Sequence, residues 1–243
     1  MKRLIIANWK CSPVNLKESK TLFNSVKKGL KSLKKTEVVI CPPFVYLPVL
    51  LAITRSSFIK LGAQNCFWEL AGAFTGEISP LMLKNLGCQY VIIGHSERRH
   101  YLLETDEMIN KKLKKLLEMG LKPIFCLGET ADERKKGKTF VVLKKQLTKA
   151  LNHLTTQLLN RLIIAYEPVW AIGTGHPCQP VEARKILLFL QKKLKQVPVL
   201  YGGSVNSSNA LEYLQVGFNG LLVGGASLKA DEFVKMVKQI DFF

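Results

Sequence analysis

Residues 162–175 read LIIAYEPVWAIGTG and join an apolar run to a polar, glycine-containing loop. The run at 162–165 predicts a buried strand. Glu167 follows directly, and Pro168 and two glycines come after it. A carboxylate at a rigid strand end can be aimed at a substrate, and a short loop between hinge residues can close as a lid. The same sequence would also fit a strand-to-helix turn with an exposed Glu, so this stretch alone leaves both interpretations open.

The same alternation of apolar run and loop recurs along the chain. Apolar runs typical of buried parallel strands alternate with segments whose apolar residues have helical spacing. We expect strands at residues 4–7, 37–41, 58–63, 90–93, 122–127, 162–165, 198–201 and 220–223. We expect helices at residues 15–33, 47–54, 79–85, 105–119, 138–151, 180–196, 208–216 and 231–240.

Eight strand–helix units without an intervening linker favour one architecture. In 243 residues they predict an α/β fold, a single-domain (β/α)8 barrel over residues 1–243. A doubly wound sheet also alternates strands and helices, but usually with fewer strands. The barrel requires functional side chains to lie at the C-terminal ends of its strands.

The chain is strongly basic, with 36 Lys and Arg against 18 Asp and Glu and a net charge of +18. Such a charge favours an anionic partner, either a polyanion or a small molecule. The lysines fall in pairs along predicted helices, as at Lys27-Lys28 and Lys144-Lys145. Dispersed pairs are typical of solvated helix faces, so despite the charge they argue against nucleic acid as a partner.

The six cysteines contain no CxxC pair and have no accompanying histidine cluster. We expect free thiols, mostly buried, in a reducing and therefore cytoplasmic compartment. The apolar run after Lys2-Arg3 is too short for a signal peptide. The longest apolar run, residues 44–53, contains Pro48 and is too short to span a bilayer, so no membrane association is expected.

Polar or glycine-rich residues follow five of the predicted strands. In a barrel these strand ends meet at one mouth. The segments concerned are Asn8-Trp9-Lys10, Gly94-His95-Ser96-Glu97-Arg98-Arg99, Glu167, Gly202-Gly203-Ser204-Val205 and Gly224-Gly225-Ala226-Ser227.

Each of these segments has a functional and a purely structural interpretation. The glycine turns after the last two strands suit a phosphate, because backbone N–H groups can approach an anion there; alone they would be tight turns. Lys10 would supply a fixed positive charge, or be one more surface lysine. His95 precedes a short helix whose positive N-terminus disfavours imidazolium, which favours a neutral hydrogen-bond donor over a buried structural histidine.

Taken together, the motifs resemble those of the triosephosphate isomerase family from end to end and in order. The resemblance implies a TIM barrel that interconverts dihydroxyacetone phosphate and D-glyceraldehyde 3-phosphate through an enediolate, in glycolysis and gluconeogenesis, without cofactor or metal. The matching segments are NWK (8–10), AQN (63–65), GAFTGEISP (72–80), YVIIGHSERR (90–99), CLGE (126–129), AYEPVWAIGTG (165–175), YGGSV (201–205) and VGGASL (223–228).

The resemblance also implies roles for individual residues. Glu167 would be the base that moves the proton, and neutral His95 would polarise the carbonyl; these two roles are the family's established ones and are carried over by the resemblance. Lys10 would stabilise negative charge, with Asn8 positioning the substrate and Glu97 as a second carboxylate. The phosphate would bind the N–H groups of Gly173, Ser204, Gly224 and Gly225. The lid would be Pro168, Val169, Trp170, Ala171, Ile172, Gly173, Thr174, Gly175, His176, Pro177 and Cys178.

Two further features concern assembly and lid motion. The loop around Thr75, Gly76 and Glu77 resembles the family's interdigitating dimer loop, which implies a homodimer. The lid ends in His176-Pro177-Cys178 where the family usually has Lys and small residues. Because Pro177 fixes its own φ and restricts His176, we expect a stiffer C-terminal hinge.

Two alternatives remain at this stage. Another phosphate-binding barrel enzyme would share the two glycine turns but would not need Glu167 with His95 and Lys10. A basic protein that binds nucleic acid would account for the charge, although no nucleic-acid motif is present.

Overall fold

The strands pair in chain order until the sheet closes on itself. The computed structural model describes residues 2–54 and 58–243. Within them, eight parallel strands form a closed barrel in which β1 pairs with both β2 and β8. The strands are β1 Arg3–Asn8, β2 Thr36–Cys41, β3 Ile59–Ala63, β4 Tyr90–Ile93, β5 Lys122–Leu127, β6 Ile163–Tyr166, β7 Val199–Tyr201 and β8 Gly220–Val223.

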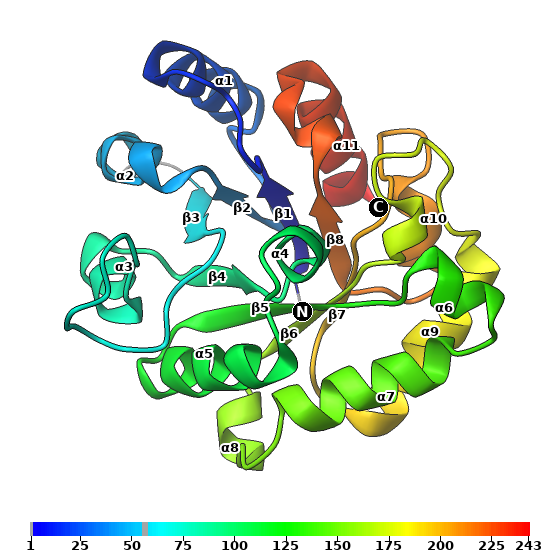
Figure 1. The fold of residues 1–243 in the computed structure, drawn as a ribbon. Helices are drawn as coiled ribbons and strands as arrows, with labels where there is room; N and C mark the ends of the chain where they lie inside the picture. The colour runs from blue at the N-terminus through cyan, green and yellow to red at the C-terminus, as the bar shows by residue number, and fades with distance from the viewer. Residues whose placement is uncertain (1, 55–57) are drawn as a thin grey trace.

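Helices surround this barrel as an outer ring (Figure 1). The helices that follow the eight strands are α1 Leu16–Gly29, α2 Leu47–Thr54, α3 Pro80–Leu86, α5 Asp106–Glu118, α7 Thr139–Ala150, α9 Pro180–Lys193, α10 Ala210–Gln215 and α11 Ala230–Phe242. The predicted (β/α)8 barrel is therefore confirmed, and β4, β5 and β8 have the predicted bounds.

Side-chain caps start several helices where the sequence favours them. The side chain of Asn15 accepts the N–H of Glu18 at the start of α1, Ser79 caps α3 and Thr105 caps α5. These oxygens satisfy N–H groups that have no partner inside the helix. The first turn of each of these helices is thereby fixed.

Two predicted helices end at least three residues earlier than expected. Helix α1 stops at Gly29 instead of residue 33, and α9 stops at Lys193 instead of residue 196. The backbone leaves helical geometry at Leu30 and at Leu194. Apolar side chains beyond these points still pack on the core from a loop, so the apolar spacing continues after the helix has ended.

Short helices without a buried face were not predicted. They are α6 Ala131–Lys135 and α8 Thr156–Leu159, neither of which contains a buried residue. Helix α4 Ser96–Tyr101 follows His95, where the sequence suggested a short helix. Three 3-10 turns, η1 Phe44–Tyr46, η2 Val169–Ala171 and η3 Gly225–Leu228, complete the connections.

The core has two layers because side chains alternate along each strand. Leu4 and Ile6 of β1 belong to the cluster inside the barrel, whereas Ile5 and Ala7 belong to the cluster between strands and helices. The interior cluster also contains Cys41, Cys126 and Tyr90. A filled barrel interior leaves the strand ends as the place for a site.

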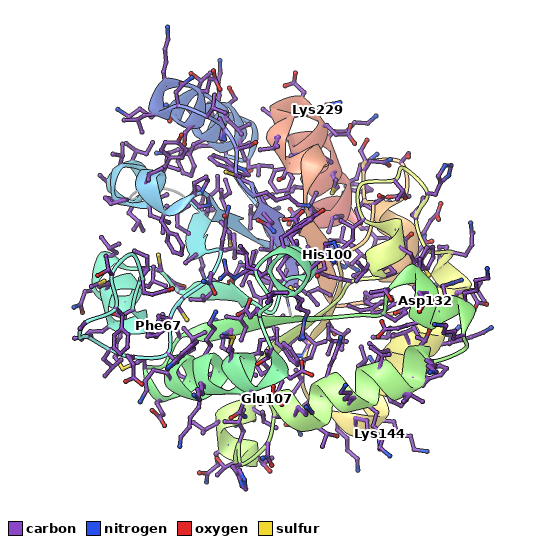
Figure 2. The ribbon with its side chains drawn as sticks, viewed as in Figure 1. Phe67, His100, Glu107, Asp132, Lys144 and Lys229 are labelled. Carbon is purple, nitrogen blue, oxygen red and sulfur yellow. The ribbon has the colours of Figure 1, made fainter. Side chains whose placement is uncertain are left out.

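Charged side chains are spread around the outer helices. Figure 2 labels Glu107 on α5, Asp132 on α6 and Lys144 on α7. Glu107 pairs with Lys149 across α5 and α7, with 2.7 Å between Oε1 and Nζ. Such exposed pairs contribute little to stability. Lys144 and Lys145 are exposed on α7, as the sequence suggested, whereas Lys112 of α5 is buried and forms an ion pair with Glu104.

The cysteines and the membrane prediction can be compared with the structure. All six cysteines are free thiols; Cys11 is exposed and the other five are buried. Burial raises the pKa of Cys66 to about 12. Among residues 2–54 and 58–243, no helix has the length and apolar character needed to cross a membrane.

Candidate active site

A cleft of about 460 Å³ opens at the C-terminal ends of the strands. The strand-end residues that the sequence singled out line it together: Asn8, Lys10, His95, Glu167, Gly173, Ser204, Gly224 and Gly225. They come from β1, β4, β6, β7 and β8 or the loops that follow these strands. Closure of the barrel therefore converts five separate sequence motifs into one site.

Glu167 lies at the centre of the cleft and is 1 % exposed. Its backbone N–H donates to the carbonyl of Leu127 (2.8 Å), which continues the pairing of β6 with β5 past the strand end. The side-chain Oε2 accepts the backbone N–H of Ser96 (2.9 Å), and Oε1 lies 3.1 Å from Nε2 of His95. The buried carboxylate is thus hydrogen-bonded through Oε2, while Oε1 lies beside the imidazole without a hydrogen-bond partner.

His95 caps the N-terminus of α4 with its side chain. Its Nδ1 accepts the backbone N–H of Glu97 (3.3 Å). The Oε2 atom of Glu97 lies 3.6 Å from the same nitrogen, beyond hydrogen-bond distance. Because Nδ1 acts as the acceptor, the hydrogen-bond pattern assigns the ring proton to Nε2, the nitrogen that faces Glu167. With this assignment the imidazole presents an N–H toward Glu167 and the cleft.

Lys10 has an unusual backbone with a φ of 54°, in the left-handed region. Two side chains hold the Lys10 backbone in this conformation. The N–H of Lys10 donates to Oδ1 of Asn8 (3.0 Å), and its carbonyl accepts a hydrogen bond from Nε2 of Gln64 (2.8 Å). A strained, non-glycine residue fixed by its surroundings is typical of a functional position.

The ammonium group of Lys10 forms an ion pair with Oε1 of Glu97. The two side chains are 30 % and 41 % exposed, so water screens the pair and its contribution to stability is small. The pair instead fixes where the lysine charge lies, at the edge of the cleft. Glu97 itself is not among the residues that line the cleft, although it contacts Lys10, which does.

The loop from Pro168 to Cys178 is buried at both ends and exposed in the middle. Gly173, Thr174, Gly175 and His176 are exposed, whereas Pro168 and Cys178 are buried. Both glycines have positive φ values, 72° and 76°. Only the exposed middle, with Ile172, Gly173 and Gly175 facing the cleft, is placed to move as a lid.

Glu129 anchors the N-terminal end of this loop. It accepts the indole N–H of Trp170 (2.9 Å) and the hydroxyl of Tyr166 (3.2 Å). Burial raises the pKa of this carboxyl group, opposed by these hydrogen bonds and by nearby Arg134. Arg134 also stacks on the Trp170 ring, 3.9 Å from its centroid. On the far side of the loop, the hydroxyl of Ser204 donates to the carbonyl of Ala171 (2.6 Å).

The sequence-based list of site residues missed three contributors. Ser96 supplies an N–H to Glu167, Gln64 holds the backbone of Lys10, and Lys229, labelled beside α11 in Figure 2, lines the cleft. Ser96 and Gln64 lie inside matching motifs, but only long-range contacts reveal what they do. Conversely, Thr75, Gly76 and Glu77 lie in an exposed loop and do not line this cleft.

Comparison with known proteins places this cleft in a family. The family model for triosephosphate isomerase matches residues 3–240. Triosephosphate isomerase of Dictyoglomus thermophilum is 46 % identical over 98 % of this chain and 99 % of its own length. The enzyme of the same name from Dehalococcoides mccartyi strain CBDB1 is 48 % identical over 98 % and 97 %.

The likeness extends to a solved structure. The crystal structure of triosephosphate isomerase from Bartonella henselae superimposes with a TM-score of 0.88 at 35 % identity and covers all of both chains. Fold, strand-end residues and sequence thus agree, and the chain belongs to the triosephosphate isomerase family.

Proposed function

We propose that this cleft interconverts dihydroxyacetone phosphate and D-glyceraldehyde 3-phosphate by proton transfer through an enediolate, as the glycolytic triose-phosphate isomerase. Family membership supports the reaction. The observation that carries the assignment of roles is the pairing of Glu167 Oε1 with His95 Nε2 at 3.1 Å inside the cleft. A carboxylate and a neutral imidazole N–H at this distance suit a base and an electrophile that act on adjacent atoms of one substrate.

In this proposal Glu167 removes a proton from the carbon beside the carbonyl and returns it to the neighbouring carbon. The Nε2–H of His95 donates to the carbonyl oxygen, where negative charge develops, and then shuttles a proton between the two oxygens. A gap of 3.1 Å leaves no room for a substrate atom, so binding must separate the two side chains. The hydrogen bond from Ser96 to Glu167 is the contact that this shift would break.

Lys10 and the glycine turns complete the proposed site. The ammonium group of Lys10 stabilises the enediolate and the bound dianion, with Asn8 and Glu97 positioning it. The N–H groups of Gly173, Ser204, Gly224 and Gly225, at the rim of the cleft, hold the phosphate. Closure of the lid excludes water from the enediolate.

A coupled spectrophotometric assay with each triose phosphate tests the reaction. We expect turnover in both directions, with inorganic phosphate as a competitive inhibitor. Phosphate binding without turnover of either triose phosphate would instead identify a different phosphate-binding barrel enzyme.

We also propose that the chain acts as a homodimer in the cytoplasm. The loop carrying Thr75, Gly76 and Glu77 is exposed, while its base is fixed by the N–H of Phe67 donating to the carbonyl of Ile78 (2.8 Å). An exposed tip on a fixed base, with Phe74 43 % exposed, suits insertion into a partner subunit. The free thiols favour a reducing compartment. Light scattering should give twice the chain mass, and a monomer would contradict the proposal.

A further inference from the structure

The C-terminal end of the lid is held at a single residue, Cys178, by two tyrosines. The N–H of Cys178 donates to the hydroxyl oxygen of Tyr201 (3.1 Å), and the hydroxyl of Tyr213 donates to the carbonyl of Cys178 (2.7 Å). All three residues are buried. Both polar atoms of one lid residue are therefore satisfied by side chains from outside the lid.

The two tyrosines form a rigid pair. Tyr201 ends β7 and Tyr213 lies in α10, and their rings stack with centroids 3.7 Å apart and planes 8° apart. Phe218 packs edge-on against both rings. Tyr201 accepts from the N–H of Cys178 and Tyr213 donates to its carbonyl, so the stacked pair holds Cys178 from both sides.

The residues next to Cys178 confine motion of the lid to the part of the loop that precedes Pro177. Pro177 fixes its own φ and restricts His176, whereas Gly173 and Gly175 are exposed. The hinge must therefore lie before Pro177, with Cys178 as its fixed end.

We propose that Tyr213 is a positioning residue that fixes the C-terminal hinge of the lid through the carbonyl of Cys178. The inference rests on the proposed isomerase function. Tyr213 does not line the cleft, so it acts only through Cys178. Its hydroxyl sets where the lid stands over the bound intermediate, and with it the position of the Gly173 N–H that holds the phosphate.

This position decides between two fates of the enediolate. In one, its carbon takes back the proton from Glu167 and the product is a triose phosphate. In the other, the electron pair of the enediolate expels the phosphate group: the carbon–oxygen bond breaks, inorganic phosphate leaves, and an enol remains that tautomerises to a dicarbonyl. Elimination requires the phosphate group to turn out of the cleft, which a correctly placed lid prevents.

The test is Tyr213→Phe, which keeps the ring stack and removes the hydroxyl. We expect kcat/KM to fall on the order of tenfold, which corresponds to the free energy of one buried hydrogen bond. We also expect the ratio of phosphate released to triose phosphate isomerised to rise. That ratio reports lid placement, which a loss of stability alone would not alter.

Tyr90→Phe is the matched control. Tyr90 is also a buried tyrosine, but its hydroxyl bonds Glu37 far from the lid, near the N-terminal end of β4. The Tyr90→Phe variant should keep the wild-type kcat/KM and the wild-type ratio of phosphate released to triose phosphate isomerised. If Tyr213→Phe does the same while the wild type isomerises normally, the inference about Tyr213 is overturned; an inactive wild type would instead overturn the proposed function.

Amide hydrogen exchange of the wild-type protein tests the premise of this inference without a variant, namely that Cys178, whose N–H bonds Tyr201 and whose carbonyl bonds Tyr213, is the fixed end of the lid. The Cys178 amide should be protected by at least about a hundredfold relative to those of Gly173 and Gly175. Equal exchange at the three amides would overturn the inference.

Discussion

Gly128 and Glu167 approach so closely that a Cβ atom on Gly128 would lie 1.7 Å from the carbonyl oxygen of Glu167. Gly128 follows β5, and Gln146 of α7 fixes its backbone through its side-chain amide, with contacts of 3.0 and 3.1 Å. Only a residue without a side chain lets the two strand ends lie this close. Gly128 thus sets the backbone position of the proposed base without contacting the substrate.

Gly128→Ala should therefore displace Glu167. Neither backbone can move freely, because the Glu167 N–H is bonded to Leu127 and Gly128 is bonded to Gln146. We expect kcat to fall by about a hundredfold, the cost of misplacing a catalytic group by about 1 Å. Gly137→Ala is the control, since space around Gly137 is open and its φ of 67° carries only a strain penalty. A Gly128→Ala enzyme with wild-type kcat would contradict this account of the contact.

Glu167→Asp should separate chemistry from binding. Removing one methylene draws the carboxylate back from the position where it meets the substrate carbon, while the phosphate end of the cleft is unchanged. We expect kcat to fall by two or more orders of magnitude, about 3 kcal/mol or more in the barrier. The inhibition constant for inorganic phosphate should stay at its wild-type value. Equal losses in turnover and in phosphate binding would show that Glu167 is structural.

The His176-Pro177-Cys178 end of the lid should change the rate of lid motion. Replacing these residues with Lys, Thr and Ala removes the φ restriction of Pro177 but keeps the backbone groups of residue 178 that bond Tyr201 and Tyr213. We expect faster lid exchange by NMR relaxation dispersion and an altered kcat. Unchanged exchange rates together with unchanged turnover would refute a stiff hinge.

Asp241 should make stability depend on pH. Burial raises the pKa of its carboxyl group, but the N–H groups of Lys34, Lys35 and Thr36 outweigh this and hold the pKa below the ordinary 3.8. The Oδ1 atom accepts the N–H of Lys35 (2.7 Å) and of Thr36 (2.8 Å), which ties α11 to the start of β2. A carboxyl group whose pKa is lower in the folded than in the unfolded protein stabilises the fold at pH values above its unfolded pKa. This stabilisation is lost as the pH falls through its folded pKa.

Asp241→Asn keeps the shape and removes the charge. We expect it to lower the free energy of unfolding by about 1 kcal/mol at neutral pH, and the difference from wild type to shrink as the pH falls below 3.8. Urea unfolding across this pH range measures it. Asp132→Asn, which removes an exposed pair with Lys136, should have little effect at any pH. A difference between Asp241→Asn and wild type that stays constant as the pH falls well below 3.8 would contradict the assignment.

The sequence by itself determined the barrel and the location of its site. Runs such as residues 90–93 and 122–127 are apolar throughout because both faces of a parallel strand are buried, so their bounds could be read directly. His95 and Glu167 could be selected because each follows such a run. Helices α6 and α8 escaped detection because they bury no apolar face and leave no periodic signal.

Only the tertiary structure decided how these residues act on one another. The carbonyl of Lys10 is held by Gln64, the carboxylate of Glu167 by Ser96, and the peptide of Cys178 by Tyr213. Each pair joins segments that lie 35 to 71 residues apart in the chain. Local periodicity reports which face of an element is buried, whereas these contacts exist only once β1 pairs with β8 and all strand ends meet at one mouth.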